Sequence, residues 1–255
     1  MFTIQTPSKD LGRIHLMQSN IVKNAALALV TALSLLLPSN ALAQFGALNK
    51  LTGGGTKADA PISLDSFGQS SADAAGQVLA ARLTFLDAQA KLMTALGLKT
   101  DAVVKASEAL RAKEGAATST GEKVAALKDS EKATAGANKE FDEALTKSDA
   151  LSAESKVKFA EGTGKFIEGV LLEKAQIETI TKLVSQGKAI ASSASIMEKV
   201  KVANMVKPVT DLSLMVPGDV KEGTSTLGKI MKFAKSQNIT NIPNSEKATS
   251  SLGEL

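Results

Sequence analysis

Carboxylates, lysines and hydroxyls are the side chains in this sequence that could carry out chemistry. The chain has 255 residues with no Cys, Trp or Tyr, and its one histidine is His15. Zinc, copper, haem and iron–sulfur sites therefore lack their usual ligands beyond residue 15, and neither a Ser-His-Asp triad nor a Cys-His pair can be built there. We predict no metal, no cofactor and no catalytic site.

Paired carboxylates occur at several places in the sequence, and each pair has lysines close by. The pairs are Asp142 with Glu143, Glu154 with Glu161, and Glu173 with Glu178. Such a mixture of charges is typical of a solvated helix face. A general acid would instead need a cleft in which burial raises the pKa of a carboxyl group. An enzyme is therefore only the third functional hypothesis.

One stretch, residues 223–229 (GTSTLGK), has the glycine and lysine spacing of a phosphate-binding loop. Ile230 follows where such a loop needs Ser or Thr, and Pro217-Gly218 precedes the stretch instead of a strand. We interpret it as the small-residue surface of a helix. Trp and Tyr are absent, so a base-stacking platform is not expected either.

Five other side chains are candidates for binding. Arg82 falls inside the apolar stripe of a predicted helix, where a guanidinium needs either a polar partner or a path to water for its charged end. Met197, Met205, Met215 and Met231 lie in the C-terminal third, where they could line a groove for a partner or an apolar ligand, or simply fill the core.

The first 43 residues have the pattern of a secretory signal peptide. Lys23 precedes an apolar run of 13 residues, 25–37 (AALALVTALSLLL), which is too short to cross a bilayer as a helix. Pro38 then breaks the helix, and residues 41–43 (ALA) form a small-x-small cleavage site. A buried core helix is the alternative interpretation of this run.

Cleavage is predicted between Ala43 and Gln44. Because Gln44 is not a cysteine, no lipid anchor is expected, and translation can start at Met1 or at Met17. No later stretch reaches 18 apolar residues, so no transmembrane helix is expected after cleavage. The predicted location is the periplasm or the cell exterior.

Removal of the leader changes the charge balance of the chain. It takes away three basic residues and one acidic residue, which leaves 212 residues with 27 basic and 25 acidic side chains, a net charge of +2. A surface so close to neutral attracts nucleic acid or anionic lipid only weakly. We predict no nucleic-acid partner.

The rest of the chain divides into three parts. Residues 44–70 predict a flexible tether because they contain three successive glycines and Pro61. Residues 71–236 predict an antiparallel bundle of about four to five helices, and residues 237–255 a loop with a short or frayed helix. The helical patterns cover 72–96, a segment that starts at Thr100, 116–150, 152–186, 188–207 and 219–236.

Two expectations concern the segment after residue 187. Pro208 is predicted to end a helix, and residues 209–218 are predicted to be irregular with a turn at Pro217-Gly218. Residues 195–207 are amphipathic and carry three lysines, so they could lie on a membrane surface, although core packing is the preferred interpretation.

The composition and the predicted bundle favour a non-enzymatic exported protein that acts by binding. An adaptor, an assembly factor or a structural protein of the cell envelope fits, with another envelope or secreted protein as partner. The alternative is a bundle that binds an apolar ligand or lipid, or one that acts on membranes as a pore-former does. The oligomeric state is not predicted.

Overall fold

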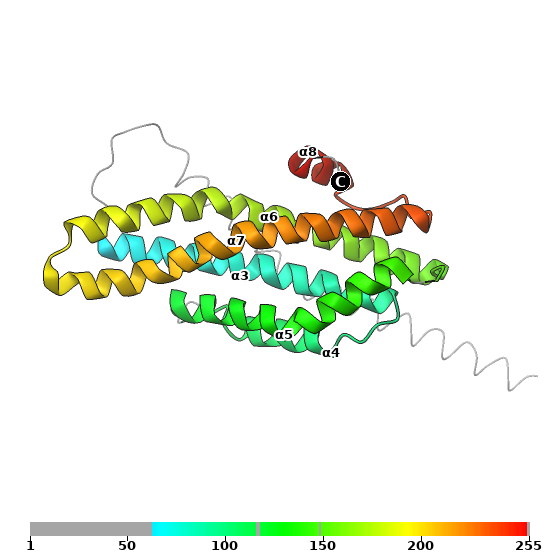
Figure 1. Ribbon diagram of the computed structural model, residues 1–255, viewed down its shortest axis with the longest axis horizontal. Coiled ribbons are helices and arrows are strands. Elements are labelled where there is room, and N and C mark those ends of the chain that lie inside the picture. Colours follow the sequence, from blue (N-terminus) through cyan, green and yellow to red (C-terminus); the bar gives the residue numbers. More distant parts are fainter. Residues whose placement is uncertain (1–62, 116–117, 148, 254–255) are drawn as a thin grey trace, which may run out of the picture. The chain divides into compact units, whose positions relative to one another are not determined.

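The computed structural model describes residues 63–115, 118–147 and 149–253, and all regular structure in these ranges is helical (Figure 1). The predicted all-α class is confirmed, whereas the predicted signal peptide and residues 44–62 of the predicted tether lie outside these ranges. The helices of the described ranges are α3 (Leu64–Ala95), α4 (Asp101–Arg111), α5 (Thr120–Lys147), α6 (Ala153–Ser193), α7 (Ile196–Ser236) and α8 (Ser245–Leu252).

Helix α3 begins earlier than predicted, so the C-terminal end of the predicted tether is wrong. The Ser63 side chain caps the helix by accepting a hydrogen bond from the backbone N–H of Ser66. Phe67, one turn into the helix, is completely buried. The helix end predicted at residue 96 is confirmed to within one residue, and Gly97, just beyond the C-cap Leu96, adopts a positive φ of 74°.

The predicted antiparallel arrangement holds for only some of the helix pairs, because three of the long helices run in the same direction. Gly121 of α5 faces Pro208 of α7, and Asp142 of α5 pairs with Lys229 of α7, so both helices advance in the same direction between these contacts. The contacts between α3 and α7 follow the same rule: Gly68 with Met205 and Phe85 with Gly223. The short α4 runs back along α3 only as far as Asp87, which pairs with Arg111 at the end of α4. From the contacts of α7 with α3 and α5, these three helices run parallel.

Glycines bring α3 and α6 into close contact. A Cβ atom on Gly162 would lie 2.9 Å from Leu92 Cγ, and one on Gly169 would lie 2.9 Å from Phe85 Cδ2. Gly169 comes after Gly162 in the sequence, whereas its partner Phe85 comes before Leu92 by the same number of residues. This order of contacts shows that α3 and α6 are antiparallel. Gly187 continues this register against Phe67. Gly187 therefore makes room for another helix and does not end α6.

The break between the last two long helices falls at Ala194 and Ser195, later than predicted. Ser195 and Glu198 form a capping box, in which each side chain bonds the backbone of the other residue. The S-x-x-E spacing of residues 195–198 is visible in the sequence and was the signal for this start.

Helix α7 continues through Pro208 and Pro217, and the predicted stop and turn at these residues are wrong. Each proline removes one backbone hydrogen bond and costs about 3 kcal/mol in a helix interior. Val209, Leu212 and Val216 are fully buried beside them. Because full burial of such a side chain contributes about 1.5–3 kcal/mol, packing offsets the cost.

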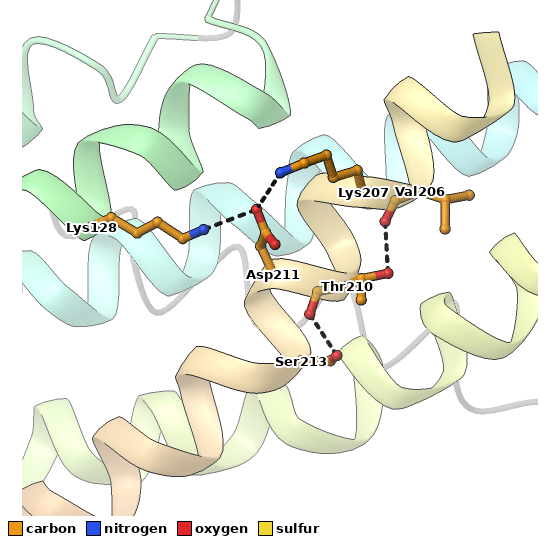
Figure 2. A network of polar contacts seen from close by, with 6 residues as sticks. All are labelled: Lys128, Val206, Lys207, Thr210, Asp211 and Ser213. Carbon is orange, nitrogen blue, oxygen red and sulfur yellow. Dashed lines mark hydrogen bonds and ion pairs between the residues drawn. The ribbon is translucent and has the colours of Figure 1, made fainter. Parts of the chain in front are cut away.

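A polar network joins α5 to α7 close to Pro208 (Figure 2). The carboxylate of Asp211 accepts hydrogen bonds from Lys128 Nζ at 2.9 Å and from Lys207 Nζ at 3.2 Å. The bond from Lys128 is the main cause that lowers the pKa of Asp211, and Lys207 adds to it. In the same turns, the Thr210 and Ser213 hydroxyls bond backbone carbonyls of α7.

Two apolar clusters fill the interior of the described bundle. The larger cluster lies along α3, α6 and the second half of α7, with contributions from α4 and α5. A smaller cluster near the start of α3 contains Phe67, Ala74, Leu183 and Val209. No helix of the described ranges is both long enough and apolar enough to cross a membrane.

The close contact of α3 with α6 predicts that alanine at Gly169 destabilises the fold. Alanine normally stabilises a helix by about 1 kcal/mol relative to glycine. At Gly169 the added methyl would press on the Phe85 ring and its backbone, so we expect the free energy of unfolding to fall by about 1–3 kcal/mol. Denaturant titration followed by circular dichroism measures this change.

Gly136→Ala in α5 is the matched control, because nothing lies within 4 Å of the position that its Cβ would occupy. This variant should gain stability by up to about 1 kcal/mol. If Gly169→Ala gains as much as Gly136→Ala, the close contact between α3 and α6 is absent.

Candidate functional site

A cleft of about 230 Å³ lies among the three parallel helices α3, α5 and α7, with α6 at its base. The parts of its wall come from distant segments of the chain: Arg82, Phe85 and Gln89 from α3; Glu131, Ala135, Asn138, Phe141 and Asp142 from α5; Phe166 from α6; Asp219, Glu222, Gly223 and Thr226 from α7.

Small residues and two tilted aromatic rings shape this cleft. Gly223 has no side chain, and a Cβ there would lie 2.9 Å from Phe85 Cζ, so the Phe85 ring can lie close to the backbone of α7. The ring of Phe85 packs on Phe166 with a centroid distance of 4.2 Å. Of the residues that α5 contributes to the cleft wall, Ala135 has the smallest side chain, and a larger one there would take up space in the cleft.

The polar wall of the cleft carries more negative than positive charge. Arg82 stands against Glu131, Asp219 and Glu222, while the fourth carboxylate, Asp142, is bound by Lys229 at 2.6 Å. Within the described ranges, Arg82 makes neither a hydrogen bond nor an ion pair through its side chain. The structure thus brings the predicted candidate Arg82 to a cleft, half-buried, with its charge available there.

Two carboxyl groups near Arg82 have raised pKa values. Burial raises the pKa of Asp219 to about 6, with Arg82 acting against the shift and Glu131 and Glu222 adding to it. Burial also raises the pKa of Glu173 to about 8, and the neighbouring Asp219 adds to this shift. Glu173 is therefore mainly protonated at neutral pH, whereas Asp219 is mainly ionised.

Glu173 was missed by the sequence analysis, and its assignment to a solvated helix face is wrong. The residue is 1% exposed, and neither carboxyl oxygen has a hydrogen-bond partner among the described residues. Gln176 on the next turn is also buried with an unpartnered side-chain oxygen. Its burial could have been predicted from its place in the apolar row of α6, because Glu173 lies three residues after Val170 and seven before Ile180. Glu178, its predicted companion, forms an exposed ion pair with Lys182.

The four candidate methionines are not brought together. Met197 is 91% exposed at the start of α7, and Met205 packs on the smaller apolar cluster. Met215 and Met231 pack on the larger cluster. At about 1.5 Å per residue, Met197 and Met231 lie about 50 Å apart along one helix, so no single groove contains all four.

The glycine-lysine stretch 223–229 lies inside α7, so it forms a helix surface and not a phosphate-binding loop. Among the residues that the structure describes, no three acidic or histidine side chains are arranged to hold a metal ion.

Comparisons with protein-family models, with curated proteins and with solved structures give no significant match for this chain.

The buried Glu173 predicts a stability that falls as pH rises. The pKa of its carboxyl group is about 8 in the folded chain and 4.5 ordinarily, so the folded state binds the proton more tightly. The free energy of unfolding should then decrease between about pH 4.5 and 8, by at most about 1.4 kcal/mol per pH unit, and level off above pH 8. Denaturant titrations at several pH values measure this slope.

Glu173→Gln should remove most of this slope and stabilise the chain by about 2–4 kcal/mol above pH 8, with little change near pH 4. Glu178→Gln is the control on the same helix, because Glu178 is exposed and the hydrogen bond from Lys182 lowers its pKa. Parallel stability curves for the parent and Glu173→Gln would contradict the raised pKa of Glu173.

Proposed function

We propose that this chain is an exported helical bundle that acts by binding another envelope or secreted protein, and that the cleft beside Arg82 receives a basic side chain of that partner. The observation that carries this proposal is the cleft of about 230 Å³, whose polar wall is mainly acidic and whose floor is aromatic. The export leader predicted for residues 1–43 supports the location of the partner.

The charges of the cleft favour a cation as ligand. Once Asp142 is neutralised by Lys229, three carboxylates remain against the single guanidinium of Arg82. A lysine side chain matches this wall, because its aliphatic stem can pack on Phe85 and Phe141 while its ammonium group reaches Glu131 and Glu222. The charged end then stays close to solvent, where an ion pair needs little desolvation.

The size of the cleft favours a side chain over a free metabolite. Sites for drug-sized ligands measure about 300–1,000 Å³. The apolar-ligand alternative has less support still, since the apolar cavity lined by Ile180, Leu212 and Val216 between α6 and α7 measures about 10 Å³.

A carboxylate-based enzyme is the second candidate function, and Asp219 is the observation that favours it. Its pKa of about 6 in a cleft is the property expected of a general acid near neutral pH. Binding ranks first because Glu173, the group with the larger shift, is not part of the cleft wall. The two functions differ in the fate of the ligand: an enzyme changes its mass, and a binding protein returns it unchanged.

Site-directed cross-linking tests the binding proposal. The chain has no cysteine, so Ala135→Cys places one thiol on the cleft wall. A short maleimide–succinimide cross-linker added in envelope extract should join this thiol to one reproducible lysine of one partner protein. Mass spectrometry of the joined peptides identifies that lysine, and the mass of the partner shows whether it has been altered.

Reversal of the rim charges provides the specificity test. Glu131→Lys with Glu222→Lys should lower the cross-linking yield at least tenfold, because like charges then face each other and tenfold corresponds to about 1.4 kcal/mol. Glu140→Lys is the control, being an exposed charge of α5 outside the cleft. Equal yields from the cleft variant and the control, or equal labelling through Ala133→Cys outside the cleft, would rule out a basic side chain in the cleft.

A further inference from the structure

The first turns of α7 carry apolar side chains that the bundle does not cover. Ile196 is 85% exposed, Met197 91% and Val200 69%. These three residues, called here the apolar tip, directly follow the turn between α6 and α7. Figure 1 shows this turn extending along the long axis of the bundle past the beginning of α5.

The apolar tip points away from the bundle. With 3.6 residues per turn, Ile196, Met197 and Val200 fall within about 100° of one another around α7. Val202 points in roughly the opposite direction and is 1% exposed, so that side of α7 faces the bundle. Core packing, the use expected from the sequence, therefore accounts for Val202 but not for the apolar tip.

Lysines surround the apolar tip. Lys199 and Lys201 lie on either side of it around the helix, and Lys188 lies near the end of α6. Residues 187–207 contain four lysines, no aspartate and a single glutamate, Glu198, whose carboxylate is bound to Ser195 in the capping box. The end of the hairpin is thus positively charged, although the chain beyond residue 43 is nearly neutral.

The small area of the apolar tip favours a lipid surface over a protein as its binding partner. A stable protein interface covers about 800 Å² and some 20–30 residues on each side, far more than three side chains on one and a half turns. A bilayer needs only a few apolar groups at the boundary of headgroups and acyl chains, with lysines near anionic phosphates.

We propose that the α6–α7 hairpin docks on the surface of a bilayer that contains anionic lipid, with Ile196, Met197 and Val200 inserted and Lys188, Lys199 and Lys201 on the lipid phosphates. This inference is independent of the cleft and of the partner proposed for it, and it gives the chain a second binding surface at the end of the same helix.

A single tryptophan reports insertion of the tip, because the chain contains none. Met197→Trp is placed in the full chain and mixed with vesicles of phosphatidylcholine and phosphatidylglycerol in equal parts. We expect a blue shift of its emission and weaker quenching by acrylamide, both absent with vesicles of phosphatidylcholine alone. The signal reports residue 197 itself, whichever other part of the chain also touches the vesicles.

Leu214→Trp is the matched control. Leu214 is 76% exposed, lies five turns further along α7 and points in the same direction as Ile196, so its emission should not change. In the Met197→Trp chain, the combined Lys188→Gln, Lys199→Gln and Lys201→Gln changes should weaken partitioning into anionic vesicles about 100-fold, or about fivefold per lysine.

Three results would overturn the proposal. One is unchanged emission of Met197→Trp with anionic vesicles while circular dichroism shows the variant folded. Another is an equal shift for Leu214→Trp. The third is a shift that appears without lipid and grows with protein concentration, because a second copy of the chain would then cover the apolar tip.

Discussion

The close packing of α3 on α6 is the constraint on which the rest of the bundle depends. Gly162, Gly169 and Gly187 remove the side chains that would hold these two helices apart, and Leu92, Phe85 and Phe67 occupy the space at matching intervals. The contact extends over most of both helices, so it fixes their register. Phe85, held against Gly169, then projects between α6 and α7 to meet Gly223, and the aromatic floor of the cleft follows from this placement.

Three charged or polar residues, Glu173, Asp219 and Arg82, interrupt the apolar core where α3, α6 and α7 meet. Glu173 has no hydrogen-bond partner among the described residues and keeps its proton at neutral pH, while Asp219 and Arg82 open to the cleft. A leucine at Glu173 would extend the apolar row of α6 without this cost. The carboxyl group therefore lowers stability where the site is built, a pattern that is common around binding sites and active sites.

The sequence predicted what local patterns determine and missed what packing determines. The end of the first helix near residue 96, the start of another near residue 152 and the all-helical class follow from short-range rules, and the structure confirms them. Local rules predict a helix end at Pro208 and a turn at Pro217, but packing of the buried Val209, Leu212 and Val216 keeps α7 helical through both prolines. The site was only partly predictable: Arg82 stood out as a charge within an apolar stripe, whereas Glu173 was hidden by lysines that are its neighbours in sequence and not in space.

The near-neutral total charge conceals two opposite local charges along α7. The acidic cleft includes Asp219, and the basic tip surrounds Val200, about 28 Å away along the same helix at 1.5 Å per residue. This separation is about three times the Debye length of 8–10 Å at physiological ionic strength, so dissolved salt screens each charged site from the other. A basic group approaching the cleft and an anionic surface approaching the tip each meet a favourable local field. The net charge, which argued against charged partners, averages over two sites that act separately.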